Sequence, residues 1–301
     1  EFLFDEDDKV NPYKITPTTG EQNYTNFLPA LHLKYIFTQN LVFRAAFTNT
    51  LARPNYYDLA PYRNIIVADN ELSEGNSTLK PTTSMNFDLM ADFYCQSIGI
   101  ISGGVFYKNL SDYFYTNIVK DYKDLKSGNT YDYYYRPENG AKANLFGFEL
   151  AIQRQLDFLP GFLKGIGIYL NYTYTSSEAE GLNIPGRESE KISLPGTAGN
   201  MLNASLSYEM SGFSMRVSMN YTSDYVDEFG ESEFYDSYYD TQTFVDFNAS
   251  YEFVNGLHFF AELNNITNQP LRYYQGKGFS DRVMQAEYYN MRINAGFKYD
   301  F

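Results

Sequence analysis

The last thirteen residues of the chain, 289–301, read YNMRINAGFKYDF and alternate between two kinds of side chain. One kind is apolar, and the other is charged, amide-bearing or glycine. The apolar set is Tyr289, Met291, Ile293, Ala295, Phe297, Tyr299 and Phe301. Because successive side chains of a strand point to opposite faces, this period of two predicts a strand with one apolar and one polar face. Such a strand suits a wall between lipid and water.

The same alternation recurs along the rest of the chain and predicts the fold class. In 202–210, for example, Leu, Ala, Leu, Tyr and Met alternate with Asn, Ser, Ser and Glu. Together with the turn signals, these runs predict eleven strands, at 29–38, 40–50, 82–95, 98–110, 141–156, 165–176, 198–210, 212–224, 242–254, 257–267 and 286–301. Strands of a soluble β-sandwich are shorter. We therefore expect an all-β fold, a transmembrane antiparallel up-and-down β-barrel.

The connections between the expected strands alternate in length. Short turns are expected at 38–40, 96–97, 211–212 and 255–256, with a slightly longer one at 157–164. The long loops between them span 51–80, 111–140, 177–196, 224–241 and 268–285. Short turns on one rim and long loops on the other are typical of outer-membrane barrels, in which the turns are periplasmic and the loops extracellular.

The composition supports this fold class and argues against several functions. The 301 residues include 30 Tyr and 25 Phe, yet the mean hydropathy is only −0.43, as expected where every second strand residue faces water. A net charge of −14 argues against nucleic acid as a partner. The single Cys95 rules out an intrachain disulfide framework and a cysteine-based zinc site, and with only two histidines, His32 and His258, we expect no transition-metal centre and no cofactor.

A series of short motifs runs along nearly the whole chain. They are NFLPALHLKY at 26–35, ARPNYYDLAPY at 52–62, GN at 75–76, LKP at 79–81, GVFYK at 104–108, GFEL at 147–150, NYTY at 171–174, LPG at 194–196 and NNITN at 264–268. In this order and spacing they resemble the C-terminal half of TonB-dependent outer-membrane receptors. The terminal Phe301, after its alternating strand, is similar to the signal that the outer-membrane assembly machinery reads.

The resemblance implies a domain organisation and a function. Residues 1–301 would form the C-terminal part of a single β-barrel domain, with about eleven strands of an expected 22-stranded, plugged barrel. The plug and the N-terminal strands would be absent from this chain. The implied function is active transport in the bacterial outer membrane, in which a nutrient binds at the extracellular loops and is imported to the periplasm. The alternative is a passive porin, or a structural or adhesive barrel.

The resemblance also implies partners. These are outer-membrane lipid, the N-terminal half of the same barrel with its plug domain, and the TonB energy-transducing complex, which acts through the plug. A surface lipoprotein that delivers substrate is a further candidate. Eleven hairpin-connected strands would not close a barrel alone, because an odd number makes the first and last strands parallel. We therefore expect 29–38 and 286–301 to be edges that pair with strands outside this chain, since open edges find no water in a bilayer.

Two loops place aromatic residues beside carboxylates. The candidate ligand-binding residues are Tyr113, Tyr115, Tyr133 and Tyr134 in one loop and Tyr235, Asp236, Tyr238, Tyr239 and Asp240 in another. Aromatic rings stack on the C–H faces of sugars, and carboxylates accept hydrogen bonds from hydroxyl groups. An aromatic girdle or packing of loop on loop explains the same residues, so both interpretations stay open.

The acidic loops bear on the class of ligand. Strongly anionic ligands are disfavoured because like charges repel, which makes a neutral oligosaccharide the favoured substrate. Ferric siderophore, haem and peptide stay open. The acidic runs would also suit Ca²⁺, although their spacing does not match an EF-hand loop. No nucleophile stands beside a base in a recognisable pattern, so we expect no enzymatic activity.

Overall fold

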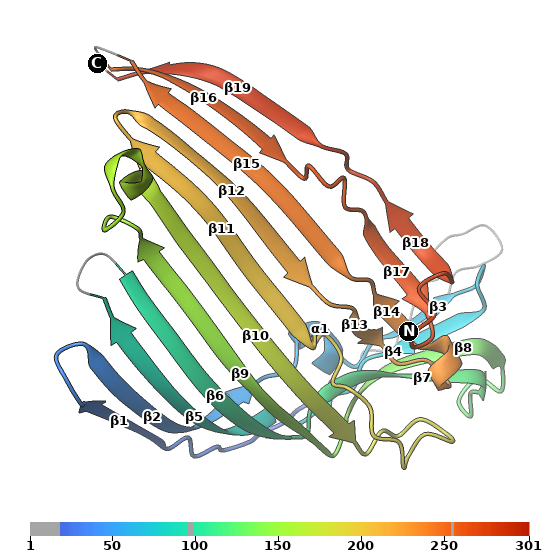
Figure 1. Cartoon of the computed structure of the whole chain (residues 1–301). Helices are drawn as coiled ribbons and strands as arrows, with labels where there is room; N and C mark the ends of the chain where they lie inside the picture. Colours follow the sequence, from blue (N-terminus) through green and yellow to red (C-terminus); the bar gives the residue numbers. More distant parts are fainter. Residues whose placement is uncertain (1–18, 96–98, 254–255, 301) are drawn as a thin grey trace.

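The computed structural model describes residues 19–95, 99–253 and 256–300, and its main feature is one antiparallel sheet of eleven strands. The strands are β1 (Ala30–Ile36), β2 (Leu41–Ala52), β5 (Thr82–Tyr94), β6 (Gly99–Ser111), β9 (Lys142–Gln155), β10 (Ile166–Glu180), β11 (Asn200–Met210), β12 (Phe213–Thr222), β15 (Gln242–Glu252), β16 (Leu257–Asn264) and β19 (Arg292–Tyr299). They follow one another across the sheet in chain order (Figure 1). The predicted all-β, up-and-down architecture with eleven strands is confirmed.

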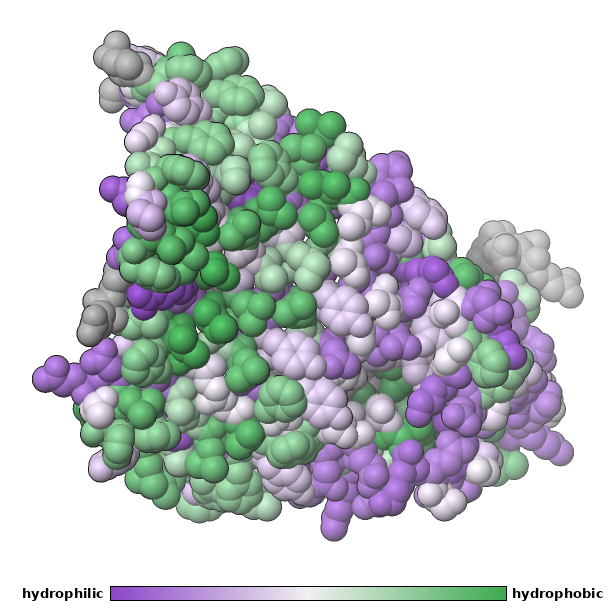
Figure 2. All heavy atoms as spheres, viewed as in Figure 1, coloured by the Kyte–Doolittle hydropathy of each residue, from purple (hydrophilic) through white to green (hydrophobic). Residues whose placement is uncertain are grey.

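The register of the sheet keeps the apolar positions of all strands on one face. At the middle of β15, Phe247 lies between Val217 of β12 and Leu263 of β16. The next residue, Asn248, points to the opposite face, where it lies between Arg216 of β12 and Glu262 of β16. A slip of one residue would reverse this arrangement, so the hydrophobic pattern specifies the pairing. Figure 2 shows hydrophobic side chains gathered over the main sheet and hydrophilic ones over the end with the long loops.

The turn between β11 and β12 shows how the sequence shapes the short connections. Ser211 and Gly212 both have positive φ, at 52° and 79°. Two such residues make the kind of turn whose twist matches the flanking strands of a hairpin. Met210 and Phe213 therefore pair directly, as the expected turn at 211–212 requires.

The long loops fold into two further sheets, which the sequence did not predict. The first has the strand order β3-β4-β8-β7 and the second β13-β14-β17-β18. Their bounds are β3 (Arg63–Ile66), β4 (Glu71–Glu74), β7 (Phe114–Lys123), β8 (Thr130–Asn139), β13 (Tyr225–Glu228), β14 (Ser237–Tyr239), β17 (Leu271–Gln275) and β18 (Val283–Glu287). Both lie at the end of the main sheet away from the short turns (Figure 1).

In the described part of the chain, helical structure is limited to three short segments. These are α1 (Tyr56–Leu59) and the 3₁₀ turns η2 (Gly161–Gly165) and η3 (Glu233–Tyr235). The Asn55 side chain caps α1 by accepting a hydrogen bond from the Tyr57 amide at 3.1 Å. Among the described residues, no helix has the length and apolar character needed to cross a membrane.

The prediction of a single strand over 286–301 is wrong at its N-terminal end. The structure assigns Val283–Glu287 to β18 of a loop sheet, and the wall strand β19 begins only at Arg292. Asn290 has a φ of 60°, a left-handed conformation that interrupts an extended chain. The alternation of side chains continues through this break, so the periodicity alone did not reveal it.

The main sheet is open. β1 and β19 lie at its two ends, and within the described residues neither pairs with the other (Figure 1). The chain thus forms a curved part of a barrel wall, not a closed barrel, as the odd number of strands led us to expect. The total of 22 strands remains a prediction.

The face assignment predicts unequal effects of one charge at two adjacent sites. Phe247→Arg should lower the free energy of unfolding of the intact receptor in lipid vesicles by about 2–4 kcal/mol, because it puts a charge into hydrocarbon near mid-strand. Asn248→Arg, on the polar face, should cost far less. Urea titrations in phospholipid vesicles measure both, and equal losses would contradict the assignment.

Candidate functional site

A cleft separates the two loop sheets. It consists of two adjoining hollows, of about 370 and 260 Å³, whose linings share Tyr135, Glu228 and Phe229. One wall comes from β7 and β8, and the other from β13, η3 and the segment between them. We call this space the loop cleft.

The strand period decides which tyrosines of β8 enter the loop cleft. Tyr133 and Tyr135 share one face and line the cleft. Tyr134 points to the other face, where its ring stacks on Tyr122 with centroids 4.0 Å apart, against the buried Leu72. Three consecutive tyrosines therefore have two different roles.

The opposite wall brings the second aromatic segment to the first. Tyr235 of η3 lies in the same hollow as Tyr133. Lys120 on β7 connects the walls, because its amine lies 3.5 Å from a Glu231 carboxylate oxygen and 5.5 Å from the centre of the Tyr235 ring. The two aromatic clusters, more than a hundred positions apart in the chain, thus meet in one cleft.

Negative charge dominates the larger hollow of the loop cleft. Asp58, Asp227 and Glu228 line it, with Arg136 as the cation among the lining residues. Burial raises the pKa of Asp58 and of Asp227, and burial together with the charge of Asp227 raises the pKa of the partly exposed Glu228. The guanidinium of Arg136 lies 3.8 Å from Glu138. The hollow therefore offers carboxylate acceptors and aromatic faces.

A buried ion pair holds two loops together behind the cleft. Arg187 and Asp236 are almost completely buried and form a two-pronged contact, with N–O distances of 2.5 and 2.9 Å. Arg187 also donates to the Gly230 carbonyl at 2.8 Å, and the Gly230 amide donates to Asp236 at 2.8 Å. This network fixes the segment that carries Phe229 and Tyr235.

A second buried pair organises the other loop sheet. Arg63 of β3 and Ser127 both donate hydrogen bonds to the Asp124 carboxylate. Burial alone would raise the pKa of Asp124, but the hydrogen bonds from Ser127 and Arg63 outweigh it and hold that pKa well below its usual range. The turn 124–129 is thereby tied to β3.

The structure separates the nine candidate ligand-binding residues into groups. Tyr113, Tyr115, Tyr134, Asp236 and Tyr238 are buried; Tyr133 and Tyr235 are 37% and 45% exposed in the loop cleft. Tyr115 also borders the cleft, and its hydroxyl accepts a hydrogen bond from the Asn183 amide at 2.6 Å.

The remaining candidates make contacts within the second loop sheet. Tyr239 packs edge-on against Tyr273 at 4.9 Å, and Asp240 pairs with Arg272 at 3.1 Å. Tyr238 stacks on Tyr274, with centroids 5.3 Å apart. Ligand contact stays a prediction for all nine, and Tyr115, Tyr133 and Tyr235 are the three that line the cleft.

Sequence reasoning missed several residues of the cleft. Asp58 and Tyr62 lie in the segment 52–62, and Asp227 and Glu228 lie in the acidic run before Phe229. Within the described ranges, no group of three or more His, Cys, Asp or Glu side chains is arranged to hold a metal ion, so the calcium hypothesis gains no support. The predicted assembly signal Phe301 lies outside the described residues.

An antiparallel wall with short turns on one rim and folded loops on the other is part of a transmembrane β-barrel. The family model described as "TonB dependent receptor-like, beta-barrel" matches residues 4–266, and the chain belongs to this family. No curated protein matches the chain significantly.

Solved structures share the fold. A mutant of the ferric enterobactin receptor of Pseudomonas aeruginosa is 17% identical with a TM-score of 0.61, and the match covers 92% of this chain and 40% of that one. The siderophore receptor PirA of Acinetobacter baumannii is 17% identical with a TM-score of 0.60, over 92% and 41%. The ferric-catecholate import receptor of E. coli is 14% identical with a TM-score of 0.57, over 88% and 34%. The chain therefore spans less than half the length of these receptors.

The buried pair predicts a large local effect of one substitution. Asp236→Ala would remove the two-pronged carboxylate partner of the buried Arg187 and leave it only the half-exposed Glu190, 2.9 Å from its Nε atom, so the opening free energy of segment 229–240 should fall by about 3 kcal/mol. Amide hydrogen exchange measures it. Glu178→Ala is the matched control, because it breaks an exposed pair with Lys191 and should change stability by no more than about 1 kcal/mol. Similar protection losses in both variants would contradict the structural role of the buried pair.

Proposed function

We propose that this chain is part of an active transporter of the bacterial outer membrane, which binds a nutrient in the loop cleft and imports it to the periplasm. Family membership supports the class of activity. The observation that carries the site is the convergence of Tyr133, Tyr135 and Tyr235 with Asp227 and Glu228 in one cleft between two loop sheets. In this proposal the receptor acts as a transporter and catalyses no reaction.

The proposed receptor needs partners that this chain does not include. Further strands would complete the barrel at β1 and β19, and a plug domain would fill the lumen and contact the TonB complex. The apolar face of the main sheet would contact outer-membrane lipid. A surface lipoprotein would be able to deliver substrate from the side of the loop sheets. In this proposal the polar face of the wall, with charged residues such as Arg44 and Asp92, would line the lumen and face the plug.

We propose a neutral oligosaccharide as the ligand. Aromatic rings and carboxylates are the groups that bind sugars, by stacking and by accepting hydrogen bonds from hydroxyl groups. Within the larger hollow, three carboxylates face the single guanidinium of Arg136. This balance disfavours an anionic ligand, because the carboxylates would repel it.

A ferric siderophore is the second candidate. The solved structures with this fold include receptors whose names specify ferric enterobactin and ferric catecholate. Arg136 borders the larger hollow and its side chain is partly exposed, so its guanidinium would be able to meet an anionic group.

The active-transport proposal predicts dependence on TonB. Cells that lack TonB should lose uptake of the ligand, while the intact receptor stays in the outer membrane at its usual abundance. Uptake is measured with labelled ligand in cells with and without TonB. Uptake that continues unchanged would support a passive porin instead.

The proposed site predicts a contrast between two tyrosines of one segment. Tyr235→Ala should weaken oligosaccharide binding about tenfold or less, because one stacking contact contributes about 0.5–1.5 kcal/mol. Tyr238→Ala should act through loop stability, since Tyr238 is buried on Tyr274. Calorimetric titration of the intact receptor with neutral hexose and pentose oligosaccharides, and with ferric enterobactin, measures affinity; hydrogen exchange measures loop order. If Tyr235→Ala changes neither affinity, the cleft is not the site; if only ferric enterobactin binds, the sugar assignment is wrong.

A further inference from the structure

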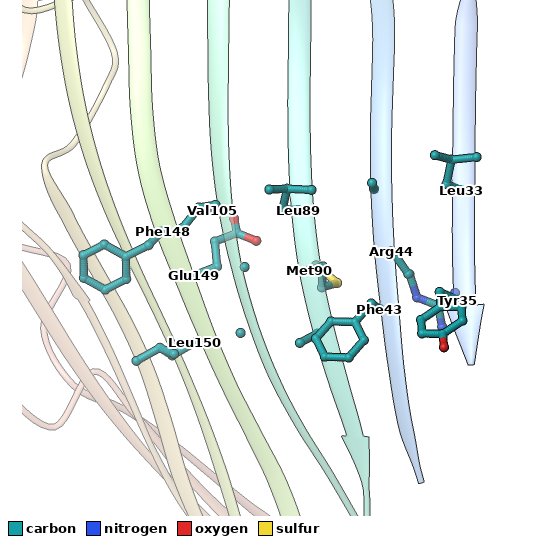
Figure 3. A pocket seen from close by; sticks show the side chains of 14 residues that line it. Leu33, Tyr35, Phe43, Arg44, Leu89, Met90, Val105, Phe148, Glu149 and Leu150 are labelled. Carbon is teal, nitrogen blue, oxygen red and sulfur yellow. The ribbon is translucent and has the colours of Figure 1, made fainter. Parts of the chain in front are cut away.

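The apolar face of the main sheet carries a groove of about 700 Å³ that spans β1, β2, β5, β6 and β9 (Figure 3). Two rows of residues, each at one level of the register, form the groove. The first row is Leu33, Ala45, Leu89, Val105 and Phe148, and the second is Tyr35, Phe43, Ala91, Gly103 and Leu150. Figure 3 shows the large side chains of both rows on either side of the positions with small residues.

Small residues in the middle strands create the depression. Ala45, Ala91 and Gly103 stand between large walls such as Leu33 and Leu89, which are 59% and 60% exposed. A Cβ atom on Gly103 would meet nothing closer than a Leu150 methyl at 3.5 Å, an ordinary contact. Packing within the chain therefore does not require glycine there. In a bilayer, hydrocarbon is the material that would fill this space.

A cation lies on the same face, nearer the short turns. Along β9 the outward residues Phe146, Phe148, Leu150 and Ile152 are apolar, and the next one is Arg154. Its guanidinium carbon lies 5.4 Å from the centre of the Phe158 ring, which is itself exposed. A Cβ atom on the adjacent Gly99 would lie 2.7 Å from Arg154 Cδ, so glycine makes room for this side chain.

We propose that this wall holds a phospholipid of the periplasmic leaflet, with an acyl chain in the groove and its phosphate at Arg154. Leu150 and Arg154 are four residues apart, which is about 13 Å along a strand. Half of the hydrocarbon core is about 15 Å thick. Because spanning strands are tilted by about 45°, these 13 Å correspond to about 9 Å of depth. With Arg154 at the level of the phosphates, the groove therefore lies within the periplasmic leaflet, within reach of an acyl chain.

Two features select the occupant. An arginine beside an aromatic ring at the membrane interface complements an anionic headgroup. The position beside the short turns selects the periplasmic leaflet, whose lipids are phospholipids, over the lipopolysaccharide of the outer leaflet. The inference rests on the placement of this wall in the outer membrane and not on the identity of the imported nutrient.

Native mass spectrometry of the intact receptor in detergent, titrated with dioleoyl phosphatidylglycerol, tests the inference. Arg154→Gln should weaken binding of the first lipid about fivefold, the effect of one arginine at an anionic lipid surface. Gly103→Val should weaken binding of the first lipid about fourfold or more, because the larger side chain would displace at least one methylene group of the acyl chain from the groove.

Two matched variants serve as controls and should bind as the unchanged receptor does. Ala249→Val likewise enlarges a small residue to valine on the apolar face, but on β15, outside the groove, and Arg216→Gln removes an arginine from the polar face of β12. Heat-dependent gel mobility verifies that each barrel is folded. The inference is overturned if the groove and control variants bind equally, or if lipid A displaces phosphatidylglycerol at equal concentration. If the unchanged receptor binds lipid as expected but takes up no nutrient, that result would count against the proposed function alone.

Discussion

Backbone hydrogen bonding in a medium without water is the constraint on which this structure depends. Hydrocarbon offers no partner for an amide or a carbonyl, so each spanning strand has to pair along both edges. In the main sheet the nine inner strands do so, from β2 to β16, and within the described ranges β1 and β19 are the strands with an open edge. The same constraint requires long, regular strands and moves irregular chain to the rims, where the two loop sheets lie.

The wall could be predicted from the sequence because lipid and water act on alternate residues over many strands. Even β6, whose Gly99, Gly103 and Gly104 blur the pattern, forms a strand of 13 residues, since β5 and β9 impose its register. The break at Asn290 could not be predicted, because a left-handed asparagine leaves the alternation intact. Periodicity reports which face a residue takes, not whether the chain turns between two strands.

The loop region could be predicted in its composition but not in its arrangement. The residues of the run at 133–135 look alike in the sequence, yet β8 sends two of them to the cleft and buries Tyr134. Asp236 looked like an exposed sugar ligand, but its partner Arg187 lies 49 positions away, with no local signal of the pairing. The carboxylates of the cleft, Asp227 and Glu228, lay beside the predicted cluster. Sequence reasoning identified the loop segments that form the site, but the tertiary pairing of those loops determines which of their residues line the cleft.

The parallel pairing of β4 with β8 has a consequence for how the molecule matures. The two strands belong to different loops, on either side of the β5–β6 hairpin, and Tyr134 hydrogen-bonds Glu74 across 60 positions of chain. Contacts of such separation form slowly, because the intervening chain has to be ordered first. The two loop sheets would therefore assemble last, on a main sheet that is already paired, and would be the first part to open in the native state. Under the proposed function, ligand binding would then depend on the least cooperative region of the described chain.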